Sequence, residues 1–180
     1  MAAPPSRRLS RQQVTQDVRR DTIVKKSVYI ETTIISYLVA RPSRDVIRAA
    51  RQKITRRWWD NRRQDFDLFV SEVVFEEARK GDKRAAERRK RILEQLTRLK
   101  ISGEAAELAA ALVEKGSMPQ KAADDALHLA VTAVQEIDFL LTWNYRHLAN
   151  AEMMSRMASV VAAQGYRVPV VCTPEELMGY

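Results

Sequence analysis

Three carboxylates in this sequence have apolar residues as their neighbours: Glu31, Glu77 and Asp125. Glu31 follows an apolar segment, and Glu77 and Asp125 each have apolar residues one helical turn away. A carboxylate that points toward a protein core needs a hydrogen-bonding partner or a metal ion, because burial of an unpaired charge is costly. These three residues are therefore the first candidates for a chemically active acidic site.

Two other acids on the same helical segments are better explained as surface residues. Glu76 has Arg79 one turn later, which predicts an exposed ion pair. Asp124 is flanked by Lys121 and His128, so its charge can be satisfied at the surface. The acid that follows each of them in the sequence lies on the apolar side of its helix and remains the candidate.

Glu31 and Asn144 each follow a predicted strand. In an open parallel sheet, ligands bind in the crevice beyond the carboxyl ends of the strands, so both side chains would reach one crevice if the two strands are neighbours. Each residue also has an ordinary explanation. Glu31 would then be a surface carboxylate at a strand end, and Asn144 a common turn residue. The sequence leaves both explanations open.

Other chemistry has little support. The two histidines, His128 and His147, are 19 positions apart, so a zinc site or a Cys–His nucleophilic pair has no local spacing. His128 lies on an apolar helix and is predicted to be a packed, hydrogen-bonded histidine. The single cysteine, Cys172, excludes an internal disulfide and favours a reducing compartment. The five glycines are dispersed, so no glycine-rich phosphate loop is present.

The elements that must position the acids alternate between strands and helices. Strands are expected over 27–31, 66–71, 138–143 and 168–172. Helices are expected after 32–33 and over 45–63, 72–81, 83–98, 103–116, 119–136, 152–164 and 174–178. Alternation of this kind predicts an α/β three-layer sandwich with a central, mainly parallel sheet flanked by helices.

Local patterns also predict how some helices begin and what they bury. The threonine pair 32–33 and Ser71 are expected to cap the helices that follow them. The helix over 45–63 carries an apolar stripe from Val46 to Trp58, so Trp58 is assigned to the core.

The 180 residues, of which 46% are hydrophobic and 30% charged, suit one domain with a tail. The net charge of +8 makes polyanions plausible partners. Residues 1–26 carry seven basic and two acidic side chains and are expected to form a disordered extension, which either helps to hold a polyanion or is a solvated tail. The domain is expected over 27–180. No apolar run could span a bilayer and no secretory signal is present, which predicts a cytoplasmic protein without membrane contact.

Four segments resemble the motif regions of a known family. They are VYIETTIISYL (28–38), SEVVFEEARKG (71–81), AADDALHLA (122–130) and DFLLTWN (138–144). In this order they are similar to PIN domains, specifically to the VapC-like ribonuclease group of toxin–antitoxin systems, and the resemblance runs from about residue 27 to the C-terminus. It implies a metal-dependent endoribonuclease whose clustered carboxylates hold Mg²⁺ or Mn²⁺.

Carried over by position, the resemblance makes Glu31, Glu77 and Asp125 the catalytic acids and, with Asn144, the metal ligands. Such an ion activates water and neutralises charge on the phosphoryl oxygens during phosphodiester hydrolysis. Two positions depart from the family pattern, because Glu31 stands where Asp is usual and Asn144 replaces an acid. These changes are expected to weaken metal binding and leave open whether the site is active.

Further expectations concern substrate and partners. Thr32 and Arg146, near the two strand ends, are candidates for contact with an RNA phosphate. The resemblance also implies a cognate antitoxin and a homodimer. One alternative is a catalytically weak PIN-like module that binds RNA or protein, which the Asn144 replacement favours. Another is a purely structural α/β domain, in which internal Lys or Arg residues would have to neutralise the acids.

Overall fold

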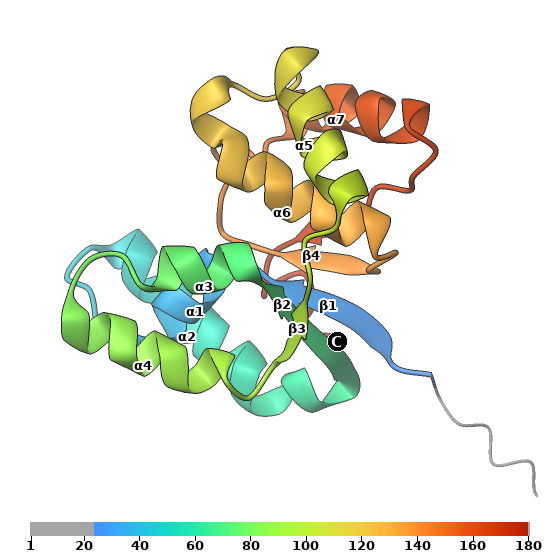
Figure 1. Ribbon diagram of the computed structural model, residues 1–180. Coiled ribbons are helices and arrows are strands. Elements are labelled where there is room, and N and C mark those ends of the chain that lie inside the picture. Colours follow the sequence, from blue (N-terminus) through green and yellow to red (C-terminus); the bar gives the residue numbers. More distant parts are fainter. Residues whose placement is uncertain (1–23, 180) are drawn as a thin grey trace, which may run out of the picture.

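A central sheet of five parallel strands organises the protein, in the order β3-β2-β1-β4-β5 (Figure 1). The computed structural model describes residues 24–179. The extension predicted over 1–26 lies outside the described residues except for its last three. The strands are β1 (Lys26–Ile30), β2 (Phe66–Ser71), β3 (Thr97–Leu99), β4 (Phe139–Leu141) and β5 (Val170–Cys172).

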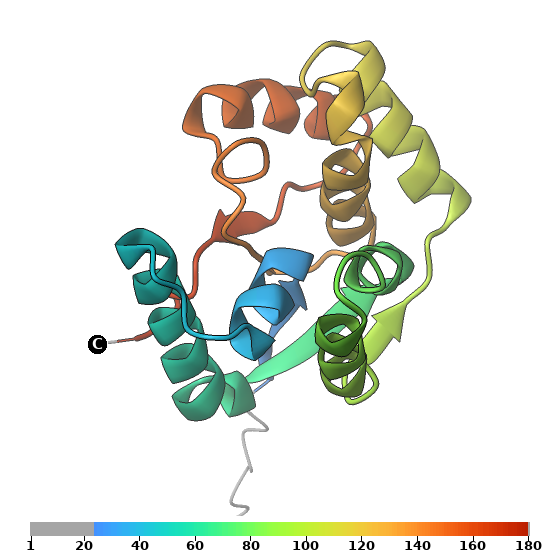
Figure 2. The same cartoon turned by 90° about the vertical axis from the view of Figure 1, so that its left-hand side faces the viewer.

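Helices cover both faces of this sheet. Figures 1 and 2 show α1 to α4 gathered on one side and α5 to α7 on the other. This arrangement confirms the predicted three-layer α/β sandwich. The helices are α1 (Thr32–Val39), α2 (Val46–Asn61), α3 (Glu72–Ala78), α4 (Lys83–Leu93), α5 (Gly103–Glu114), α6 (Ala123–Val134) and α7 (Ala151–Ala163), with short 3₁₀ turns η1 (Arg63–Asp65) and η2 (Gln120–Ala122). None of the described helices is long and apolar enough to cross a membrane.

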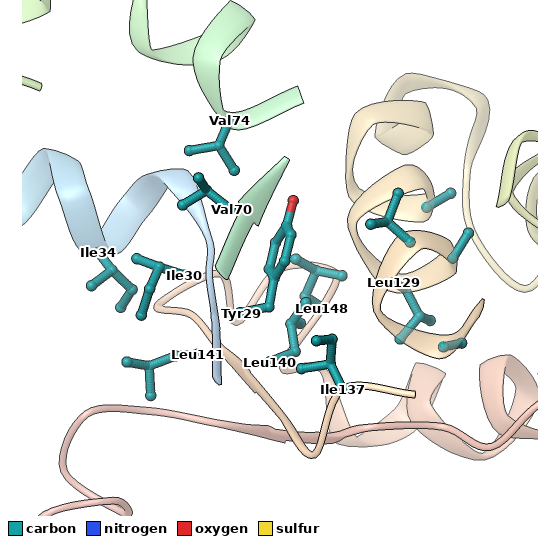
Figure 3. Packing of buried hydrophobic residues seen from close by; sticks show 14 of the residues in the cluster. Tyr29, Ile30, Ile34, Val70, Val74, Leu129, Ile137, Leu140, Leu141 and Leu148 are labelled. Carbon is teal, nitrogen blue, oxygen red and sulfur yellow. The ribbon is translucent and has the colours of Figure 1, made fainter. Parts of the chain in front are cut away.

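The central strands β1 and β4 are buried on both faces, as expected for the middle of a parallel sheet. Tyr29 pairs with Leu140 and Ile30 with Leu141, so alternate positions point to opposite layers. Figure 3 shows Tyr29 and Leu140 on the side of Leu129 from α6, while Ile30 and Leu141 face α1. All five of these side chains are fully buried.

Asp138 fixes the register of β1 against β4. Its carboxylate accepts hydrogen bonds from the Ser27 backbone N–H and hydroxyl, both at 3.0 Å, and pairs with Lys26 Nζ at 2.9 Å. The N–H of Ser27, with help from Lys26, lowers the pKa of Asp138 from 3.8 to about 2. This clamp holds the start of both strands in line, so their carboxyl ends also meet.

The β3 strand was not predicted. The helix expected over 83–98 ends as α4 at Leu93, and β3 pairs with β2 along the edge of the sheet. Two of the three β3 residues are exposed, so the strand carries no apolar run that a sequence pattern could detect. Its conformation comes from backbone pairing with β2. The helix expected over 174–178 is also wrong, because these residues form turns after β5.

Helix α2 buries only the C-terminal part of the predicted stripe. Val46 is 81% exposed, and the side chains that reach the core are Gln52, Thr55, Trp58 and Trp59. The core assignment of Trp58 is confirmed. The first turns of α2 lie at the surface, so helical periodicity identified a face without showing how far along the helix that face remains covered.

Candidate active site at the carboxyl edge of the sheet

Glu31 follows β1 directly and caps the N-terminus of α1. Its side chain, in a residue 3% exposed, accepts hydrogen bonds at Oε2 from the Thr33 N–H at 3.0 Å, the Thr142 hydroxyl at 2.8 Å and the Thr33 hydroxyl. The prediction that threonine hydroxyls cap this helix is therefore wrong, because the hydroxyls donate to the carboxylate that does so. Burial raises the pKa of Glu31, although His128 and the hydroxyl donors oppose that effect.

Glu77 reaches the same place from α3. Its Oε2 accepts a hydrogen bond from the Thr32 hydroxyl and lies 3.1 Å from Nε2 of His128. Burial alone would raise the pKa of this carboxyl, but the hydrogen bonds from His128 and Thr32 outweigh it and the pKa is lowered. Glu77 is thus held in its ionised form.

His128, on α6, is fully buried and lies between Glu77 and the sheet. Its Nδ1 is 2.7 Å from the Tyr29 hydroxyl, which is 2.5 Å from the Ser71 hydroxyl. An ionised Glu77 accepts from Nε2, so in the neutral ring Nδ1 accepts the Tyr29 proton. Burial lowers the His128 pKa, but the hydrogen bond to Glu77 and the charge of Glu31 raise it overall.

The hydrogen-bond network Ser71–Tyr29–His128–Glu77 confirms the prediction of a packed, hydrogen-bonded His128. It also explains a wrong prediction, because the Ser71 hydroxyl turns to Tyr29 and makes no hydrogen bond that caps α3. Tyr29 stays protonated, since burial raises its pKa. This hydrogen-bond network connects the middle of the sheet to the acidic edge.

Asp125 occupies the other side of this edge and has two donors of its own. Its Oδ1 accepts from Asn144 Nδ2 at 2.8 Å, and its Oδ2 accepts from His147 Nδ1 at 2.7 Å. Asn144 Oδ1 in turn accepts the His147 N–H at 3.2 Å. The Asn144 amide therefore presents its nitrogen to the site, and its oxygen, expected as a ligand, is engaged by backbone.

Three titratable groups come together, two of the three expected acids and one histidine. Ligand atoms of Glu31, Glu77 and His128 all lie within 4.8 Å of one another, and Asp125 is outside this group. The Asp125 charge still acts on the ring of His128, whose pKa it helps to raise. The two carboxylates are oxygen donors of the kind that Mg²⁺ and Mn²⁺ prefer, whereas both ring nitrogens of His128 are already used in hydrogen bonds to Glu77 and Tyr29.

No lysine or arginine among residues 24–179 forms an ion pair with Glu31, Glu77 or Asp125. Lys80 is close enough to lower the Glu77 pKa, but it pairs with Asp124 at 3.6 Å. In the described chain the hydrogen bonds to these three acids therefore come from histidines, hydroxyls, a backbone N–H and an amide, not from the internal Lys or Arg that a purely structural domain requires.

The acids that were set aside lie at the surface as predicted. Glu76 pairs with Arg79 at 2.6 Å, and Asp124 with Lys80. Between them and Glu77 is a cavity of about 480 Å³ over α3 and α6, with Arg98 on its rim. This cavity gives Glu77 access to solvent.

The remaining residues singled out from the sequence have different positions. Thr32 donates its hydroxyl proton to Glu77, so it is occupied within the site. Arg146 is exposed in the loop after β4. His147 was missed, and the only signal was its place three residues after Asn144 in that same loop. Burial raises the pKa of Cys172 to about 12, so its thiol is not a nucleophile at neutral pH.

Comparison with known proteins agrees with this architecture. The family model for the PIN domain matches residues 28–152. Among curated protein sequences, none matches the chain. Similar solved structures include the Mycobacterium tuberculosis toxin VapC20, described as cleaving the sarcin-ricin loop, with 18% identity and a TM-score of 0.51, covering 63% of this chain and 87% of that one.

Two further structures are similar in fold. A toxin–antitoxin complex from Klebsiella pneumoniae has 18% identity and a TM-score of 0.51, covering 82% of this chain and 98% of that one. VapBC2 from Rickettsia felis, bound to a DNA fragment from its promoter, has 14% identity and a TM-score of 0.52, covering 81% and 97%. With the family model spanning most of the described residues, the chain belongs to the PIN domain family.

Proposed function

We propose that this PIN domain is a metal-dependent endoribonuclease that hydrolyses RNA phosphodiester bonds. The observation that carries the proposal is the approach of Glu31, Glu77 and His128 within 4.8 Å at the carboxyl edge of a parallel sheet, where ligands bind in such folds. The net charge of +8 suits a polyanionic substrate. The description of VapC20 as a sarcin-ricin loop cleaving toxin supports RNA as that substrate.

Glu31 and Glu77 would hold the ion, Mg²⁺ or Mn²⁺, while His128 orients Glu77 through its Nε2 hydrogen bond. Such an ion, when bound, supplies a water of lowered pKa and neutralises charge on the phosphoryl oxygens. Internal hydrogen-bond donors hold Oε2 of both glutamates in place and so orient the two carboxylates for an ion. No hydrogen bond from the described residues reaches Oε1 of either glutamate, which leaves these oxygens for a ligand.

Asp125 adds a third negative charge, oriented by Asn144 and His147. We assign Asn144 to positioning Asp125, since its amide nitrogen makes that contact. Thr32 is assigned to orienting Glu77, and the exposed Arg146 to contact with an RNA phosphate. In each case the assignment follows from the contact or exposure of the side chain.

The wider biological setting is also part of the proposal. The toxin–antitoxin complexes among the similar structures support a VapC-like toxin with a cognate antitoxin. We further propose a homodimer, a cytoplasmic location consistent with the single free Cys172, and a basic extension over 1–26 that contributes to RNA affinity.

The direct test is cleavage of a pool of single-stranded and structured RNA in Mg²⁺, Mn²⁺ or EDTA. Glu77→Gln and Asp125→Asn should abolish metal-dependent cleavage. Each has a matched control one residue earlier in the sequence, Glu76→Gln and Asp124→Asn, which removes an equal charge at the surface and should leave cleavage intact. Cleavage that persists in Glu77→Gln would show that the assignment of the site is wrong.

A second candidate function is a PIN-like module that binds RNA or protein and cuts weakly or not at all. The position of Asn144 favours it, because the amide removes a charge and presents no free oxygen to the site. Folded wild-type protein that binds RNA but leaves it intact in both metals would establish this alternative.

A further inference from the structure

An exposed aromatic ring lies next to the acidic site. Tyr145 is 45% exposed, one of few large apolar or aromatic side chains that reach solvent among the described residues. It follows Asn144, whose side chain contacts Asp125 at 2.8 Å. Tyr145 and Asn144 are consecutive in the loop after β4, so a strand of RNA with a phosphate at the acids would bring a neighbouring nucleotide close to this loop.

The Tyr145 ring is held in place by the guanidinium of Arg51, which also contacts the buried indole of Trp143. The guanidinium carbon of Arg51, from α2, lies 4.9 Å from the centre of the Tyr145 ring and 5.5 Å from that of Trp143. Trp143 is fixed by its Nε1 bond to Thr55 at 2.8 Å and its backbone N–H bond to Thr33 at 2.9 Å. Tyr145 is therefore preorganised, and little conformational freedom remains to be lost on binding.

Charge around the ring favours a base over a phosphate at this place. Burial raises the pKa of the Tyr145 hydroxyl; the charges of Glu176 and Glu175 add to this effect, and Arg51 and a hydrogen bond with Thr173 oppose it. These acids disfavour a phosphate at the hydroxyl edge. The Arg51 guanidinium has no ion-pair partner among residues 24–179, so its positive charge remains available to the RNA.

We propose that Tyr145 and Arg51 form a nucleobase subsite that stacks one unpaired base of the RNA beside the acidic site. The inference rests on the proposed function for the identity of the ligand as RNA. Stacking on an aromatic ring tolerates any base, because every base presents a π face. The subsite therefore selects single-stranded RNA over duplex without reading its sequence.

The test is the equilibrium dissociation constant of a short fluorescein-labelled single-stranded RNA, measured by fluorescence anisotropy in EDTA so that no cleavage is required. Tyr145→Ala should weaken binding about tenfold, the scale of one base–aromatic stack. Tyr145→Phe keeps the ring and should bind like wild type. Arg51→Ala should weaken binding more than Arg57→Ala, which removes an equal charge from an exposed position on the same helix.

An abasic oligonucleotide of equal length separates stacking from general electrostatics. Wild type and Tyr145→Ala should bind this probe equally. Equal affinity of wild type and Tyr145→Ala for the RNA, a loss in Tyr145→Phe as large as in Tyr145→Ala, or no RNA binding by wild type would each overturn the subsite. If Tyr145→Ala instead lost affinity only for a protein partner, the surface would be a protein interface and the proposal would be wrong.

Failure of the subsite is distinguishable from failure of the nuclease. Wild-type protein that binds RNA through Tyr145 but does not cut it in Mg²⁺ or Mn²⁺ retains the subsite and loses the nuclease. Wild-type protein that cuts RNA while Tyr145→Ala keeps full affinity retains the nuclease and loses the subsite.

Discussion

Removing the Tyr29 hydroxyl should destabilise the fold far more than the loss of one oxygen atom suggests. This hydroxyl contacts the Ser71 hydroxyl at 2.5 Å and His128 Nδ1 at 2.7 Å, and all three side chains are fully buried. Tyr29→Phe therefore leaves two buried polar groups without their partner. Each such group costs about 1–3 kcal/mol, so the free energy of unfolding should fall by about 3 kcal/mol.

The measurement is urea unfolding followed by circular dichroism, with thermal melting in parallel. For a domain of this size, a loss of about 3 kcal/mol corresponds to a melting temperature lower by about 6–12 °C. Tyr37→Phe is the control, because no hydrogen bond from the described residues reaches the Tyr37 hydroxyl, and its effect should stay within about 0.5 kcal/mol.

A double-mutant cycle shows whether the Ser71–Tyr29–His128 hydrogen-bond network acts as a unit. Ser71→Ala removes one of the two buried polar groups that Tyr29→Phe leaves without a hydrogen-bond partner. The double variant should therefore be no less stable than Tyr29→Phe alone, a strong departure from additivity. A Tyr29→Phe protein as stable as Tyr37→Phe, or strictly additive single effects, would refute the view that this hydroxyl satisfies buried groups on both sides.

Three further predictions concern the site and the start of the sheet. Mg²⁺ and Mn²⁺ should each raise the melting temperature, because both bind carboxylate oxygens, and no shift with either ion at millimolar concentration would favour a structural domain. Asn144→Asp replaces a 2.8 Å hydrogen bond to Asp125 by facing carboxylates, so unfolding in EDTA should become easier by about 1–3 kcal/mol and Mn²⁺ should close that gap. Because the folded-state pKa of Asp138 is lowered from 3.8 to about 2, its contribution to stability is present above pH 3.8 and lost as the pH falls to about 2. Urea unfolding of Asp138→Asn should accordingly be easier than that of wild type at pH 7, with the difference disappearing at pH 2.

The sequence allowed prediction of the fold wherever an element buries an apolar face. The strands β1, β2 and β4 and the helix α5 lie close to their expected positions, because alternating or continuous apolar patterns define them. The strand β3 was missed since it is short, exposed and specified by pairing with β2. Long-range pairing of this kind leaves no local trace in the residues themselves.

The site was predicted less completely than the fold, for a related reason. Glu77 and Asp125 stood out through the apolar residues around them, and the structure places both at the carboxyl edge. The inclusion of His128 in place of Asp125 in the tightest group depends on how α3 and α6 pack, which helical periodicity does not report. The role of Asn144 depends on which end of its amide faces Asp125, and only the surrounding donors decide that.

These donors explain how several acids are tolerated at one edge although no Lys or Arg among residues 24–179 pairs with them. Each acid has at least one oxygen fixed by neutral groups or histidines: hydroxyls for Glu31, a hydroxyl and His128 for Glu77, Asn144 and His147 for Asp125. A carboxylate in place of Asn144 would add repulsion where the amide now supplies a proton. The Asn144 amide therefore stabilises the metal-free arrangement of Asp125, and the Asn144→Asp experiment measures the loss of that stabilisation in EDTA and its recovery in Mn²⁺ in one protein.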